Sequence, residues 1–92
     1  MELYSRIYTI SGRVQGVGFR YHTAMNAQML GITGYARNQS DGTVTVLAEG
    51  NREQLDALHG HIAEGPRFSQ VNSLEYDERA ISARSYRSFS TS

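Results

Sequence analysis

The sequence of 92 residues contains no cysteine, no lysine and no tryptophan. The lack of cysteine excludes disulfides and fits a reducing compartment. All nine basic residues are therefore arginine, which excludes a Schiff-base lysine, a lysine general base and a P-loop lysine. No stretch of the sequence resembles a signal peptide, and no apolar run is long enough to cross a membrane. We expect a cytoplasmic protein with no membrane partner.

The chain also lacks an excess of charge, since nine acidic residues balance the nine arginines. Proteins that bind nucleic acids usually carry a basic excess, so we expect no nucleic-acid partner. The length and the 39% of apolar residues fit one small domain. We therefore expect a single domain over residues 1–92, and we expect it to be monomeric.

Hydrophobic patterning predicts strands at 3–14, 32–38, 43–48 and 71–76, and helices at 19–30 and from Asn51 to Gly65-Pro66. The order β-α-β-β-α-β is that of an α/β (α+β) ferredoxin-like sandwich. Such a sandwich has an antiparallel sheet with two helices on one face. Around Phe89 the sequence allows either a short C-terminal edge strand or a frayed end.

Periodicity also predicts which side chains are buried. In the first helix, one face is predicted to hold Phe19, Thr23, Ala27 and Leu30. Three larger residues are predicted to widen this face: Tyr21, Met25 and Met29. In the second helix the buried stripe is Leu55, Leu58 and Ile62, and Asn51 with Gln54 forms a capping box. We interpret Glu49, Glu53 and Asp56 as solvated, and His59 and His61 as facing different ways on their helix.

A glycine-rich segment, Gly12–Arg20, separates the first predicted strand from the first helix. Gly16 and Gly18 have no Cβ, so their backbone N–H groups can turn toward a bound group. No Ser, Thr, Asp or Asn stands at the start of the helix to cap its first N–H groups. These donors lie at the positive end of the helix dipole, which suits a phosphate or carboxylate. Arg20 adds a planar, permanently charged guanidinium beside them.

A second segment of interest, Gly34–Gly50, contains the predicted hairpin with an Asp-Gly turn. In the predicted fold this hairpin lies beside the first strand. Asn38, near the end of its strand, could then approach the glycine-rich segment. A carboxamide both donates and accepts hydrogen bonds, so it can hold a water molecule while leaving that water free to attack.

The two segments resemble both signature segments of the acylphosphatases. They read Ile10-x-Gly12-x-Val14-Gln15-Gly16-Val17-x-Phe19-Arg20 and Gly34-Tyr35-Ala36-Arg37-Asn38-x-x-x-Gly42-x-Val44 through Gly50. The agreement in order and length of the elements extends from about Tyr4 to Tyr76. Alone, the glycine loop could be a tight connection, Arg20 a surface residue and Asn38 a turn former. Their joint occurrence within two full motifs favours a functional site.

The resemblance implies hydrolysis of acyl phosphates to a carboxylate and inorganic phosphate, without metal or cofactor. It implies that Asn38 orients the nucleophilic water and that phosphate is bound by the Arg20 side chain and by backbone N–H groups of Gln15, Gly16, Val17, Gly18, Phe19 and Arg20. It also implies a sheet in which the first and third strands are central. The substrate would be a small molecule, recognised mainly by its carboxyl-phosphate group.

Two other functions stay open on the sequence alone. One is an anion-binding or RNA-binding module on the same fold. RNA recognition would favour stacking aromatic residues on the central strands, and residues 43–48 include none. The other is a catalytically idle relative that acts as a maturation or regulatory domain. Such domains of this family occur within longer proteins, whereas this chain ends soon after the predicted domain.

Overall fold

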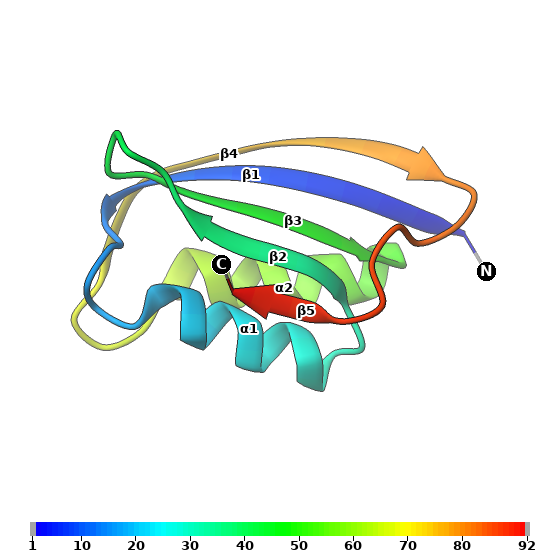
Figure 1. Cartoon of the computed structure of the whole chain (residues 1–92), viewed down its shortest axis with the longest axis horizontal. Coiled ribbons are helices and arrows are strands. Elements are labelled where there is room, and N and C mark those ends of the chain that lie inside the picture. The colour runs from blue at the N-terminus through cyan, green and yellow to red at the C-terminus, as the bar shows by residue number, and fades with distance from the viewer. Residues whose placement is uncertain (1, 92) are drawn as a thin grey trace.

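The computed structural model describes residues 2–91. Within them it has the strands β1 (Leu3–Arg13), β2 (Thr33–Asn38), β3 (Val44–Gly50), β4 (Gln70–Ile81) and β5 (Phe89–Thr91), and the helices α1 (Phe19–Met29) and α2 (Arg52–Glu64). The strands form one sheet in the order β4-β1-β3-β2-β5. Both helices cover the same face of this sheet (Figure 1). The predicted ferredoxin-like sandwich is confirmed, with β1 and β3 in the middle of the sheet.

Two strands differ from the prediction. β4 continues to Ile81, well beyond the predicted end at Tyr76, because it pairs with β1 along its whole length. As an edge strand it exposes side chains on both faces, which weakens the alternation that would have marked it. β5 forms at the other edge and pairs with β2 in parallel, from Gly34–Phe89 to Ala36–Thr91. The sheet is therefore mixed rather than wholly antiparallel.

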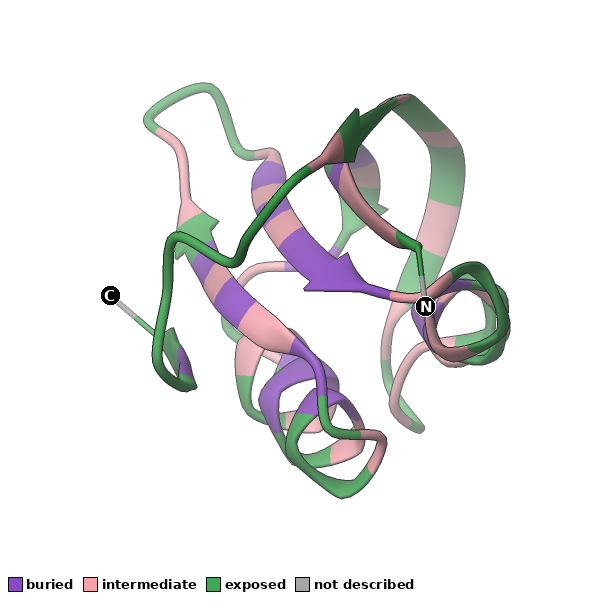
Figure 2. Ribbon diagram, turned by 90° about the vertical axis from the view of Figure 1, so that its right-hand side faces the viewer, coloured by how far each residue is buried: buried purple, intermediate pink, exposed green. Residues whose placement is uncertain are grey.

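The core lies between the sheet and the helices, and Figure 2 shows buried residues concentrated along β3. The predicted stripe of α2 is confirmed, since Leu55, Leu58 and Ile62 are fully buried. The predicted capping box is confirmed as well. Asn51 Oδ1 accepts a hydrogen bond from Gln54 N, and Gln54 Oε1 accepts one from Asn51 N, both at 2.8 Å.

The predicted face of α1 is only partly right. Phe19, Thr23 and Ala27 are buried, but the three residues expected to widen this face are exposed: Tyr21, Met25 and Met29. These three follow Phe19 by two, six and ten positions. At roughly 100° per residue they fall on the opposite side of the helix from the buried stripe. They form an exposed line along α1 instead.

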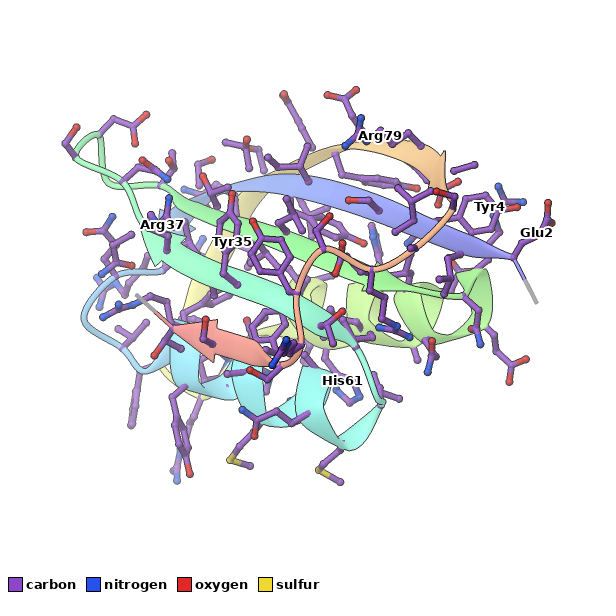
Figure 3. The ribbon with its side chains drawn as sticks, turned by 45° about the vertical axis from the view of Figure 1, so that its right-hand side comes forward. Glu2, Tyr4, Tyr35, Arg37, His61 and Arg79 are labelled. Carbon is purple, nitrogen blue, oxygen red and sulfur yellow. The ribbon has the colours of Figure 1, made fainter. Side chains whose placement is uncertain are left out.

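The prediction that Glu49 is solvated is wrong, because only 2% of this residue is exposed. Its carboxylate accepts hydrogen bonds from Thr33 Oγ1 and from the backbone N–H groups of Ser85 and Tyr86. The ring of Tyr86, in the segment between β4 and β5, contacts that of Tyr35 at 5.7 Å between centroids. Figure 3 shows Tyr35 beside this segment, where it crosses the face of the sheet that the helices leave open. Glu49 thus fixes the segment that carries the chain from β4 to β5.

A second buried charge, Arg6, joins three elements. Its Nη2 atom lies 2.6 Å from Asp56 Oδ1 on α2, and its Nε atom lies 2.7 Å from Glu78 Oε1 on β4. Its Nη1 atom donates a hydrogen bond to Tyr8 Oη at 3.1 Å. The hydrogen bond from Arg6 lowers the pKa of Glu78. As predicted, Glu53 and Asp56 themselves lie at the surface.

Candidate active site

The loop between β1 and α1 is anchored at both ends in the core. Val14 precedes it and Phe19 follows it, and each is about 1% exposed. Between them, Gly16 and Gly18 adopt φ angles of 75° and 79°. This left-handed conformation is unfavourable for residues that carry a Cβ. The backbone therefore requires glycine at both positions. Gly18 is the N-cap of α1, which has no side-chain cap. The uncapped helix start expected from the sequence is confirmed.

The backbone donors of this loop are not used by the sheet or by the helix. Within residues 2–91, no backbone carbonyl accepts a hydrogen bond from the N–H groups of residues 15–19. The first N–H groups of any α-helix have no partner inside the helix. These donors lie at or just before the N-terminus of α1, where the helix dipole is positive, and a helix N-terminus attracts anions.

A cavity of about 200 Å³ opens over this loop, lined by Val14, Gly16, Gly18, Phe19, Arg20, Tyr21, Asn38 and Thr91. Asn38 reaches it from the end of β2 and Thr91 from β5. Figure 1 shows the β1–α1 loop and the tip of the β2–β3 hairpin at the same end of the molecule. The structure therefore brings Arg20, Asn38 and the loop glycines together. The side chains of the other two predicted loop residues point elsewhere, Val17 toward the core and Gln15 toward the hairpin.

Asn38 presents a polar atom in need of a donor. Its Oδ1 atom is buried and accepts no hydrogen bond from any residue among 2–91. A buried acceptor without a partner is costly, so such atoms in native proteins usually meet a partner that the protein itself does not supply. Asn38 is one of the residues that line the cavity, so a water molecule bound there is a candidate donor to this atom.

A family model described as Acylphosphatase matches residues 6–91 of this chain. The chain belongs to the acylphosphatase family. It is 44% identical over 78 residues to an acylphosphatase of Aliivibrio fischeri, a match that covers 85% of this chain and 87% of the relative. The crystal structure of acylphosphatase from Bacillus subtilis is similar with a TM-score of 0.89 at 37% identity, and 98% of each chain is covered.

The same fold also occurs as a small part of a longer protein. A crystal structure of full-length HypF, in a phosphate- and nucleotide-bound form, matches with a TM-score of 0.86 at 26% identity. This match covers 100% of the present chain and 12% of the HypF chain. The curated acylphosphatases match over most of their own length. The matches support an acylphosphatase hydrolase.

The three histidines of this family member lie outside the cavity lining. His22 Nε2 lies 3.3 Å from the backbone oxygen of His61, so its ring is turned toward α2. His59 Nδ1 lies 3.2 Å from Tyr8 Oη, so His59 and His61 face different neighbours as predicted. Among residues 2–91, no three His, Cys, Asp or Glu side chains are grouped to hold a metal ion. Neither helix of this part of the chain is long and apolar enough to span a membrane.

Sequence reasoning did not find two features of the site. The side chain of Gln15 donates from Nε2 to the carbonyl oxygens of Gln39 and Thr43, at 2.8 and 2.9 Å. Thr91, on the short strand β5, forms part of the cavity wall. No local sequence pattern indicates either feature, because each depends on where a segment distant in the sequence is placed.

Proposed function

We propose that this chain hydrolyses acyl phosphates in the cavity over the β1–α1 loop, with Arg20 and Asn38 in the roles that the family resemblance implies. One observation carries the proposal. An uncapped helix N-terminus, a guanidinium and a buried carboxamide oxygen without a donor surround the same cavity of about 200 Å³. The first two suit a phosphate group, and the third suits a water molecule.

In this mechanism the phosphate group of the substrate lies against the loop. The N–H groups of residues 15–20 donate to its oxygens, and the Arg20 guanidinium pairs with two of them. Charge builds up on these oxygens in the transition state. Donors held in place by a folded loop stabilise that charge without having to reorganise during the reaction.

Asn38 Oδ1 accepts a hydrogen bond from the attacking water. This hydrogen bond orients the water so that a lone pair of the water oxygen points at phosphorus. The bond from the water oxygen to phosphorus forms while the bond from phosphorus to the carboxyl oxygen breaks. The bond electrons leave with the carboxylate, and the water proton passes to a phosphate oxygen of the substrate. A carboxylic acid has a pKa of roughly 4 in water, so the leaving group needs no general acid.

The proposal is tested by phosphate release from acetyl phosphate, benzoyl phosphate and a phosphate monoester. We expect turnover of both acyl phosphates and poor turnover of the monoester, because an alkoxide is a much worse leaving group. Retention on heparin or RNA at low salt is measured in parallel. Retention without turnover would favour the binding module, and neither retention nor turnover would favour a catalytically idle domain. Either result would contradict the proposed activity.

We predict that kcat is nearly flat between pH 5 and 8 and is unchanged by excess EDTA. A guanidinium and a carboxamide do not change protonation in this range, and the mechanism assigns no proton transfer to any other side chain. The pH–rate profile is measured for the wild type and for His22→Gln. An inflection near pH 6.5 that disappears in His22→Gln would instead indicate general-base catalysis by this histidine.

We further propose that residues 1–92 act as one domain, as a monomer and in the cytoplasm. The zero net charge and the lack of cysteine support a small-molecule substrate and a reducing compartment over a nucleic-acid partner. Sedimentation of the purified chain tests the oligomeric state.

A further inference from the structure

The side chain of Gln15 connects the two halves of the site. Its backbone belongs to the β1–α1 loop, while its Nε2 atom donates to the carbonyl oxygens of Gln39 and Thr43 in the β2–β3 turn. These two residues close the turn, since Gln39 N donates to Thr43 O at 2.8 Å. The Gln15 amide is therefore inserted at the base of the hairpin, next to the end of β2.

The two accepting carbonyls belong to the residues next to Asn38 and next to its cross-strand partner. Gln39 follows Asn38 directly in the chain. Thr43 directly precedes Val44, which is the cross-strand partner of Asn38. One side chain thus holds the two residues that adjoin the Asn38–Val44 pair on its turn side. The same residue carries one of the proposed phosphate-binding N–H groups.

Other contacts of the turn keep its shape but do not fix it to the loop. Asp41 Oδ1 accepts hydrogen bonds from the N and Oγ1 atoms of Thr43, at 3.0 and 2.7 Å. Gln39 Nε2 donates to Thr45 Oγ1 at 3.0 Å. All three hydrogen bonds lie within the hairpin. Loss of the Gln15 amide would leave the hairpin folded but less firmly placed against the phosphate-binding loop.

We infer that Gln15 is a positioning residue for the hydrolysis: its side chain sets the distance and orientation of Asn38 relative to the bound phosphate. This inference rests on the proposed function, because it assumes that Asn38 holds the attacking water. Misplacement of a reacting group by about 1 Å can lower a rate by about 10²-fold. The effect of Gln15 should therefore appear in kcat and depend on the presence of Asn38.

The test is a double-mutant cycle of Gln15→Met and Asn38→Ala, measured with acetyl phosphate. Gln15→Met keeps the length of the side chain but removes the donors, and we expect kcat to fall by about 10²-fold. Inhibition by inorganic phosphate should change far less. In the Asn38→Ala background the same substitution should lower kcat by no more than about threefold, since no side chain is left to be positioned.

The matched control is Gln54→Met. Gln54 is also half-buried and its Nε2 atom donates to a backbone carbonyl of another segment, Leu30 O, at 2.8 Å. It lies outside the cavity lining, so we expect lower thermal stability with kcat unchanged. If Gln15→Met does not fold, Gln15→Glu replaces it, because a carboxylate of the same shape cannot donate to the two carbonyls.

Three results would overturn the inference alone: a wild-type kcat in the Gln15 variant, an equal fall of kcat with and without Asn38, or a weakening of phosphate inhibition as large as the fall of kcat. The last two would mean that Gln15 shapes the phosphate-binding loop instead. A wild type without turnover, or a fully active Asn38→Ala variant, would overturn the proposed function and this inference together.

Discussion

Replacement of Arg20 by lysine should lower kcat/KM for acetyl phosphate by about 10³–10⁵-fold, as for other arginines that stabilise a transferred phosphoryl group. The substitution keeps the charge but removes the fork that binds two oxygens in one plane. Arg20 lies in the first turn of α1 and lines the cavity beside the uncapped N–H groups. We therefore expect its guanidinium to share one phosphate with these donors. Initial rates of phosphate release measure the effect.

Arg13→Lys is the matched control, because Arg13 is an exposed residue at the end of β1 and does not line the cavity. The same change of side chain there should leave kcat/KM close to that of the wild type. A value for Arg20→Lys within tenfold of the wild type would exclude the proposed role. Binding would then rest on the charge and on the backbone donors, without the planar geometry of the guanidinium.

The local part of the site could be predicted because it follows from short-range rules. Gly16 and Gly18 indicate a left-handed backbone, and the missing cap residue indicates free N–H groups at the start of α1. Both features are present in the structure. The approach of Asn38 needed one further step, the predicted order of elements, which sets the hairpin beside β1. The chemical roles of Arg20 and Asn38 came from the family resemblance and stay proposals.

The features that escaped prediction depend on contacts between distant segments. Glu49 is polar and lies on the open face of the sheet, so alternation alone makes it solvated. It is buried because the backbone N–H groups of residues 85 and 86 donate to its carboxylate. No sequence pattern near Glu49 predicts these two donors. Gln15 is a similar case, since its two acceptors are backbone carbonyls that no side-chain pattern reveals.

The parallel pairing of β5 has the same origin. The segment after β4 crosses from one edge of the sheet to the other, and hydrogen bonds to Glu49 hold it on the way. The crossing places Phe89 beside Gly34 and Thr91 beside Ala36. It also brings Thr91 into the wall of the cavity. The tail, for which the sequence allowed either a short edge strand around Phe89 or a frayed end, thus contributes to the wall of the cavity.

Replacement of Asn38 by alanine should lower kcat for acetyl phosphate by about 10²–10³-fold, by analogy with the loss of one positioned hydrogen-bonding group elsewhere. Competitive inhibition by inorganic phosphate should be largely unchanged. The proposed mechanism assigns phosphate affinity to the loop and Arg20, whereas Asn38 acts on the water in the transition state. The measurements are kcat from initial rates and the inhibition constant of phosphate.

The contrast between these two constants is what identifies the role of Asn38. A group that binds substrate and transition state equally changes the inhibition constant and KM, while one that acts only on the attacking water changes kcat. Asn72→Ala, the same substitution at an exposed position of β4, should alter neither. If phosphate no longer inhibits Asn38→Ala, the carboxamide binds the phosphate itself. The buried Oδ1 atom would then need a donor other than the attacking water.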